Sequence, residues 1–399
     1  MRTVLLPRRR DDERDPQPRQ GPAKVKPIHL FVPAFRVDEC LAEIRECLER
    51  GWTGLGYKTV EFERQWIAHT RLPHAHFLNS ATAGLHLAVR LLKERHGWGD
   101  GDEIISSPLT FVSSNHAILY ERLRPVFADV DEYLCLDPAS ITERITPRTR
   151  AVIFVGLGGN TGRLDEVVEL CRDRGLALIL DAAHMTGTRL RGRHVGGEGE
   201  VSVFSFHAVK NLPTADGGMI CFREGAADAA VRKWTWLGID KDTYSRTQSD
   251  SAYKWHYQVE HVGFKYHGNS IMAGLGLVAL RYLEQDNAHR RQLASWYDDA
   301  LVDVPGVERV RVAPDCESAR HLYQVLVDRR DDVMVALNTA EIYPGVHYRD
   351  NGLYTMYADQ PPCPRARRAS DRVISLPMHL GLDWFDVERV CDTLRRIVS

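Results

Sequence analysis

The amino-acid sequence predicts an α/β fold in which helices cover a mostly parallel sheet. The first observation is that short runs of Val, Ile and Leu alternate with helical stretches. Such continuous apolar runs are typical of strands that are buried on both faces of a parallel sheet. The second observation is the length of 399 residues with 44% hydrophobic residues, which is enough for one large domain and a smaller one.

The large domain is expected over residues 28–283, with its sheet roughly within residues 55–270. Asp38 is expected to cap a first helix that Gly51 closes, and the turn Asn79-Ser80 leads into a second helix that reaches Leu92. The remaining elements alternate, with strands at Glu103–Ser106, Pro125–Ala128, Ala151–Val155, Leu176–Leu180, Val201–Phe206 and Met219–Phe222, and helices at Ser113–Tyr120 and Leu164–Arg174.

A smaller α+β domain is expected over residues 284–399. It follows an apolar helix around Ile271–Leu283, beyond which the composition becomes more polar through Gln292–Arg311. Its expected elements are a strand at Gln324–Val327, a helix at Asp332–Ala340, a strand near Val346 and a helix at Trp384–Ile397.

The charge pattern gives no general reason to expect nucleic acid as a partner. The net charge is −2, with 27% charged residues. Residues 1–27 hold eight Lys or Arg against four Asp or Glu, with several prolines and few apolar residues, so we expect a disordered tail. A nucleic-acid-binding arm is the alternative for this tail, although aromatic interleaving and repeated motifs are missing from it.

The cysteines and the apolar segments indicate a cytoplasmic protein without a metal site. The eight cysteines are scattered, with no Cys-x-x-Cys pair and no Cys/His cluster of the zinc-binding kind, so we expect free thiols. The apolar run at the N-terminus is too short for a signal peptide, and no stretch of about 18 apolar residues is available to span a bilayer.

Lys210 lies in a turn between two predicted buried strands, Val201–Phe206 and Met219–Phe222. An ammonium group there is costly unless it is paired or neutralised. A Schiff-base lysine meets this condition, because condensation with an aldehyde turns the amine into an imine whose charge a cofactor phenolate balances. Taken alone, a lysine in a salt bridge at the rim of the sheet is the simpler interpretation.

Asp181 ends the predicted strand Leu176–Leu180, at the edge where α/β sheets bind ligands. Pyridoxal phosphate (PLP) needs an anion against its pyridine nitrogen, because the protonated ring is the electron sink. Asp181 can supply this anion, and His184 three residues later can reach the ring hydroxyl. The alternative is an aspartate that caps the following turn.

Three further features fit a PLP site. The segment Asn79–Ala83 opens a helix with small residues and a hydroxyl, which is suited to bind phosphate. Ser205 can face the same phosphate and Phe111 can stack on the ring, although a helix cap, a satisfied strand serine and a core phenylalanine are the structural alternatives. The agreement among these features favours PLP as the cofactor.

At these motifs the chain resembles the DegT-type (DegT/DnrJ/StrS) sugar aminotransferases, which are PLP enzymes of fold type I, the aspartate-aminotransferase fold. The resemblance runs from about Phe31 to Val398. It rests on Gly51-Trp-Thr-Gly54, Asn79-Ser-Ala-Thr82, Asp181-Ala-Ala-His184, Ser205-Phe-His-Ala-Val-Lys210-Asn211, Gly217-Gly218, Gly263-Phe-Lys-Tyr266, Gly345-Val-His-Tyr348 and Leu376-Pro-Met-His379.

The resemblance implies a role for each of these positions. Lys210 would form the Schiff base and move protons, Asp181 would pair with the ring nitrogen, and His184 would lie by the ring hydroxyl. The other implied roles are phosphate binding for Ala81, Thr82 and Ser205, ring stacking for Phe111, and a place near the substrate for His347 and Tyr348.

The resemblance also implies a homodimer, because in the family the segment matching Gly263–Tyr266 reaches the cofactor phosphate of the partner subunit. Lys265 stands where the family more often has asparagine, and a lysine can still meet a phosphate as a point charge. The chain departs from the family pattern at two other places, Gly158–Gly162 and Val209. Both departures leave the implied chemistry intact, but they do not point to a particular substrate.

The implied function is a transamination from glutamate or glutamine to a nucleotide-linked keto-sugar or a related cyclitol ketone, for the amino sugar of a natural product or a cell-surface glycan. The alternatives are a sugar dehydratase of the same family, in which histidine replaces the lysine, and a non-catalytic PLP-binding regulator. The ketone, the position and stereochemistry of amination, the donor and the pathway stay open. Residues of the segment 241–261 line the sugar side or form a solvated loop: Tyr244, Arg246, Tyr253, Lys254 and Trp255.

Overall fold

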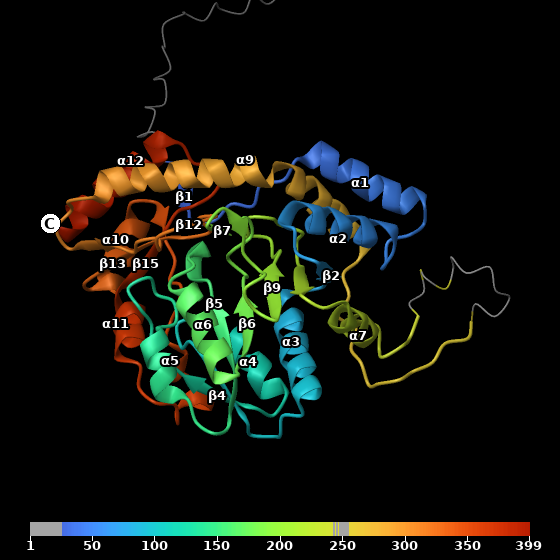
Figure 1. The fold of residues 1–399 in the computed structure, drawn as a ribbon. Coiled ribbons are helices and arrows are strands. Elements are labelled where there is room, and N and C mark those ends of the chain that lie inside the picture. Colours follow the sequence, from blue (N-terminus) through green and yellow to red (C-terminus); the bar gives the residue numbers. More distant parts are fainter. Residues whose placement is uncertain (1–25, 242–243, 245, 247–254) are drawn as a thin grey trace, which may run out of the picture.

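The computed structural model describes residues 26–241, 244, 246 and 255–399 (Figure 1). All but the last two residues of the predicted tail, 1–27, therefore lie outside the described residues. Within the described chain, none of the helices combines the length and the apolar character that a membrane crossing requires.

A seven-stranded sheet forms the centre of the large domain. Its strand order is β2 (His74–Leu78), β10 (Gly218–Phe222), β9 (Val201–Ser205), β6 (Ala177–Asp181), β5 (Thr149–Val155), β3 (Glu103–Ser106) and β4 (Arg124–Phe127). Strand β10 runs antiparallel to both of its neighbours, and the other neighbouring pairs are parallel. The predicted α/β fold with a mostly parallel sheet is confirmed.

Helices bury both faces of this sheet, as the apolar strands predicted. Side chains alternate along a strand, so that Leu178 and Leu180 of β6 join one core while Ala177 and Ile179 join the other. The first core includes residues of α2 (Tyr57–Thr70), α6 (Leu164–Arg174) and α9 (Ser270–Leu301). The second includes residues of α3 (Ala81–His96), α4 (Val112–Tyr120) and α7 (Gly225–Thr235).

The prediction that Asp38 caps the first helix is wrong. Helix α1 spans Val37–Glu49 with Arg36 at its N-cap, and the cap makes no side-chain hydrogen bond. Asp38 lies instead in the first turn, where its charge still favours the helix dipole. Strand β2 was not among the predicted strands, because its sequence His-Ala-His-Phe-Leu lacks the apolar run that marks the others.

Helix α9 is longer than the apolar stretch that predicted it. Beyond Leu283 the sequence is polar on average, but Leu293, Tyr297 and Leu301 recur at helical spacing and are buried. They pack in a third core, the C-terminal core, with residues of β13 (Tyr323–Val327), β15 (Val373–Leu376) and α12 (Trp384–Val398). Figure 1 shows α9 running along the molecule from α1 to α12.

The C-terminal region holds several small elements. An antiparallel sheet has the order β11 (Val307–Arg309), β13 and β15, and helices α10 (Arg330–Thr339), α11 (Pro364–Arg372) and α12 accompany it. Strand β1 (Ile28–His29) pairs in parallel with β14 (Ile342–Tyr343), so the strand expected near Val346 ends three residues earlier. The predicted boundary between residues 283 and 284 falls inside α9, and the two-domain division stays a prediction.

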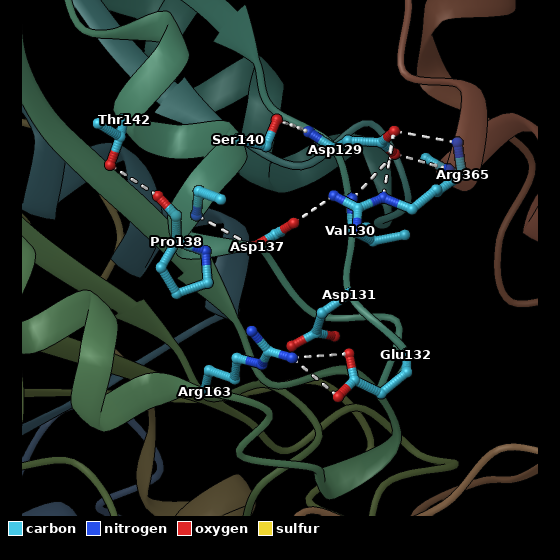
Figure 2. Close-up of polar contacts among 12 residues, drawn as sticks. Asp129, Val130, Asp131, Glu132, Asp137, Pro138, Ser140, Thr142, Arg163 and Arg365 are labelled. Carbon is cyan, nitrogen blue, oxygen red and sulfur yellow. Dashed lines mark hydrogen bonds and ion pairs between the residues drawn. The ribbon is translucent and has the colours of Figure 1, made fainter.

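The loop after β4 joins the C-terminal region to the large domain (Figure 2). Asp129 accepts hydrogen bonds from the first amides of α11, those of Arg365 and Ala366, at 3.0 and 2.8 Å. The Arg365 side chain pairs with Asp137, which caps α5 (Pro138–Arg144). These contacts fix how the chain after residue 363 sits against the central sheet.

Asp131, in the same loop, is a buried carboxyl group with one unsatisfied oxygen. Its Oδ1 accepts from the amides of Tyr133 and Cys135 at 2.9 and 3.0 Å, while Oδ2 is buried and has no hydrogen-bond partner within the described part of the chain. Burial, with a smaller contribution from Glu132, raises the pKa of Asp131 to about 7. In the folded protein the carboxyl group therefore stays protonated up to a higher pH than an ordinary aspartate, and it ionises near pH 7.

An Asp131→Asn variant should gain stability over the wild type as the pH rises. The pKa of Asp131 is higher in the folded protein than in the unfolded chain. The stability that its protonated form gives to the fold is therefore fully present below about pH 4 and is lost as the pH rises through about 7. The difference in unfolding free energy between variant and wild type should grow by at most about 1.4 kcal/mol per pH unit between pH 5 and 7. Urea denaturation across this range measures it, and a constant difference would contradict the prediction.

Candidate active site

A cavity of about 320 Å³ opens at the carboxyl edge of the central sheet. Lys210 follows β9, Asp181 ends β6, and Phe111 follows β3, so the parallel strands deliver these side chains to one place. Nine of the ten predicted site residues line this cavity: Ala81, Thr82, Phe111, Asp181, His184, Ser205, Lys210, His347 and Tyr348. Lys265 lies elsewhere.

Lys210 lies deep in the protein with its amine at the cavity. Burial lowers its pKa from 10.5 to about 7, and the nearby carboxylate of Asp181 opposes this shift. Its Nζ is 3.4 Å from Nε2 of His321. Near pH 7, a much larger fraction of this amine is neutral, and therefore nucleophilic, than for an ordinary lysine.

Asp181 is buried at the end of β6 and is held by two donors. Ser114 Oγ donates to Oδ2 at 2.7 Å, and the amide of Ala183 donates to Oδ1 at 3.1 Å. Burial raises the pKa of Asp181 above its ordinary value, against the effects of these donors and of Lys210. Burial thus disfavours the ionised form of Asp181, and a cation placed against the carboxylate would stabilise that form.

His184 is neutral and its tautomer is defined by its partners. The amide of Gly158 donates to Nδ1 at 3.2 Å, so Nε2 carries the hydrogen and donates to the hydroxyl of Tyr348 at 3.1 Å. Burial and the neighbouring Lys210 hold the pKa of His184 well below its ordinary value. Since both nitrogens have partners, the predicted contact with a ring hydroxyl requires one of these bonds to open, and the role stays a prediction.

The first turn of α3 forms one end of the cavity. Ser80 caps the helix by accepting from the amide of Ala83 at 3.1 Å, and the amides of Ala81 and Thr82 are first-turn donors without an intrahelical acceptor. Gly218 of β10 lies against this turn, because a Cβ there would be 2.6 Å from the nitrogen of Ala81. This helix start offers free N–H groups and a favourable dipole to an anion.

The remaining predicted residues differ in their surroundings. Phe111 is 58% exposed and its ring is 6.0 Å from that of Tyr348. His347 is bound to Ser375 Oγ at 2.9 Å, and burial lowers its pKa to about 4. The Nζ of Lys265 is 3.2 Å from the centre of the Trp236 ring. Within the segment 241–261, Trp255 is 69% exposed, and Tyr253 and Lys254 lie outside the described residues.

Three residues of the cavity wall that were not predicted make contacts with the predicted ones or with each other. His321 contacts Lys210, Phe31 stacks on His321 with ring centroids 5.3 Å apart, and Ser114 holds Asp181. His321 and Phe31 lie far from Lys210 in the sequence and carry no motif of their own. Ser114 lies three residues after Phe111, at the start of the predicted helix Ser113–Tyr120, so its place in the first turn after a strand end was an available signal.

These groups fit PLP. Asp181 offers a buried carboxylate that lacks a full cationic partner, which suits the protonated pyridine nitrogen, and Lys210 offers an amine for the aldehyde. The first turn of α3 offers N–H groups without an intrahelical acceptor for the phosphate, and it packs so closely on Gly218 that a Cβ there would lie 2.6 Å from the nitrogen of Ala81.

The model of the DegT/DnrJ/EryC1/StrS aminotransferase family matches residues 36–395. Among curated relatives, the spore coat polysaccharide biosynthesis protein SpsC of Bacillus subtilis is 34% identical over 90% of this chain and 95% of its own length. The aminotransferase TlmJ from Streptoalloteichus hindustanus has a TM-score of 0.86 and 33% identity, covering 93% of this chain and 98% of its own.

A second solved structure bears on the cofactor. The putative sugar aminotransferase Spr1654 from Streptococcus pneumoniae, in its PLP-form, has a TM-score of 0.85 and 26% identity over 94% of this chain and 99% of its own. The same protein is also known in a PMP-form. The chain belongs to the DegT/DnrJ/EryC1/StrS family and is a PLP-dependent aminotransferase of fold type I.

Proposed function

We propose that this enzyme transfers an amino group from glutamate or glutamine to a nucleotide-linked keto-sugar or a related cyclitol ketone. The product would be an amino sugar of a natural product or a cell-surface glycan. The observation that carries the proposal is the joint placement of Lys210, Asp181 and the α3 helix start around one cavity. The names of the relatives support a sugar as acceptor, since SpsC is a polysaccharide biosynthesis protein and Spr1654 a putative sugar aminotransferase.

Lys210 would bind the cofactor covalently and move the proton. When bound, PLP supplies an electron sink for the substrate carbon that loses its proton. The amine of Lys210, freed when the amino donor enters, would take the proton from that carbon and return it at a second position. Its pKa of about 7 suits both directions of transfer near neutral pH.

The other cavity residues would bind and orient. Asp181 would hold the ring nitrogen in its protonated form, and Ala81, Thr82 and Ser205 would hold the phosphate. Phe111 and His184 would border the ring, and His347 and Tyr348 would face the substrate. These assignments are supported by the position of each side chain on the cavity wall.

Lys265 would act across a homodimer. Its amine lies outside the cavity of its own chain, on the ring of Trp236, and burial lowers its pKa. We propose that it meets the cofactor phosphate of the partner subunit, with both active sites at the interface. The enzyme would work in the cytoplasm on small-molecule substrates, without nucleic acid or membrane as partner.

A sugar dehydratase of the same family is the alternative reaction. The presence of Lys210, where the dehydratases have histidine, favours transamination, because the dehydratase lacks the lysine amine that binds the cofactor.

Sodium borohydride reduction of the PLP-loaded enzyme should attach the cofactor to Lys210. Peptide mass spectrometry locates the adduct. In the apoenzyme, the rate of covalent attachment should rise with pH through about 7 rather than near 10, because only the neutral amine reacts. Lys210→Ala should lose the adduct and at least about 10³-fold in kcat. An adduct on another lysine would refute this assignment.

Asp181→Asn should slow the first half-reaction by about 10²-fold, since a neutral amide stabilises the protonated ring nitrogen less than a carboxylate. Stopped-flow absorbance with glutamate measures the rate. Asp173→Asn, on α6 and away from the cavity, is the control. Equal rates for Asp181→Asn and the wild type would contradict the proposed contact.

A substrate panel tests the proposed reaction itself. Glutamate or glutamine should convert the bound cofactor to its amine form, and one of a set of nucleotide-linked keto-sugars should convert it back while gaining an amino group. Absorbance follows the cofactor and mass spectrometry identifies the product. If the sugars stay unchanged while a simple keto acid restores the cofactor, the acceptor class is wrong.

A further inference from the structure

We propose that His321 positions the amine of Lys210, and that Asn211 and Asn287 fix the one tautomer of His321 in which it can do so. The inference rests on the proposed function, because it requires Lys210 to be the reactive lysine. It concerns three side chains that are at least nine-tenths buried: His321 is 1% exposed, Asn211 6% and Asn287 0%.

Two backbone carbonyls, which can only accept hydrogen bonds, determine how the amides of Asn211 and Asn287 are oriented. The side-chain amide of Asn211 donates to the carbonyl of Ala319 at 2.7 Å, and that of Asn287 donates to the carbonyl of Thr186 at 3.0 Å. Asn211 also donates to Oδ1 of Asn287 at 2.7 Å. These bonds leave one orientation for each amide, with Oδ1 of Asn211 directed away from Ala319.

The amide orientation sets the tautomer of His321. Oδ1 of Asn211 lies 3.1 Å from Nδ1 of His321 and can only accept, so Nδ1 carries the hydrogen. Burial and the neighbouring Lys210 hold the pKa of His321 well below its ordinary value, so the ring is neutral and has a single N–H. Nε2 is therefore the nitrogen with the lone pair, and it faces Nζ of Lys210 at 3.4 Å.

The ring of His321 is also held by its neighbours. Phe31 stacks on one side, with planes 7° apart and centroids separated by 5.3 Å. The ring of His184 lies 4.4 Å away, centroid to centroid. Asn287 reaches Thr186 because Gly187 has a φ of +90° and no side chain: a Cβ at Gly187 would lie 2.1 Å from Nδ2 of Asn287.

The tautomer decides what the amine of Lys210 can do. With the lone pair of Nε2 facing it, the neutral amine donates one N–H to His321 and keeps its own lone pair free. That lone pair takes the proton from the substrate carbon: a C–H bond breaks, an N–H bond forms, and the C–H electron pair stays with the substrate. In the other tautomer, an N–H of His321 would point at Lys210 and occupy this lone pair.

The first experiment measures the tautomer in the apoenzyme. In protein labelled with ¹⁵N-histidine, the resonances of His321 are assigned by their loss in His321→Asn. Nδ1 should show the shift of a hydrogen-bearing nitrogen and Nε2 that of a hydrogen-free one. Asn211→Leu, which keeps the volume and removes the acceptor, should shift Nε2 toward the hydrogen-bearing value. A hydrogen on Nε2 in the wild type would overturn the inference.

The second experiment measures proton transfer. Glutamine can place an oxygen near the position of Nε2, whereas asparagine reaches only the position of Nδ1. His321→Asn should slow the amino-donor half-reaction by about 10- to 100-fold and raise the deuterium isotope effect at the donor carbon, while His321→Gln should recover most of the rate. His289→Asn, a histidine of α9 bound to the carbonyl of Leu382, is the matched control and should match the wild type.

The borohydride adduct separates the two proposals. If the adduct is absent from Lys210, the proposed function fails. If Lys210 carries the adduct and His321→Asn keeps the wild-type rate and isotope effect, the positioning role of His321 fails alone. Loss of rate in His321→Asn and His321→Gln alike, with an unchanged isotope effect, would assign His321 a purely structural role and also overturn the inference.

Discussion

The placement of two ionisable groups of opposite charge deep in the protein is the constraint on which the site depends. Burial raises the pKa of Asp181 and lowers that of Lys210, so each group alone tends toward its neutral form. A cofactor with a cationic ring nitrogen and an aldehyde relieves both costs at once. The proposed binding of PLP to these residues would therefore stabilise the fold as well as enable the reaction.

The central sheet brings these two groups together because its parallel strands end at the same edge. Strands β6 and β9 lie side by side and in parallel, so Asp181 and the turn before Lys210 emerge at the same edge. The start of α3 is brought to the same edge because β10 has a glycine where it meets the helix. The C-terminal region then closes the cavity with His321, His347 and Tyr348.

The sequence was informative where a residue's environment follows from its neighbours along the chain. Lys210 and Asp181 were identified because each interrupts or ends a run of buried apolar residues, and the structure places both on one cavity. His321 could not be found in this way, since its importance comes from contacts with Lys210 and Asn211, more than 100 residues away. The second half of α9 was missed for a different reason, because its apolar positions are masked by a polar average composition.

Helix α9 has a consequence for how the enzyme can move. Leu283 is the last of its residues in the core shared with α2 and α6, and Leu293 is the first in the C-terminal core. Asn287 lies on the stretch between them, where one continuous helix passes from one core to the other. A bend of the helix at this point would move the Asn287 amide away from Thr186. In the proposed arrangement, Asn211 and His321 would then no longer be held in one orientation and one tautomer. The continuity of α9 past Asn287 would thus be a condition of the proposed chemistry, because it keeps the Asn287 amide against the carbonyl of Thr186 while the amine of Lys210 is in use.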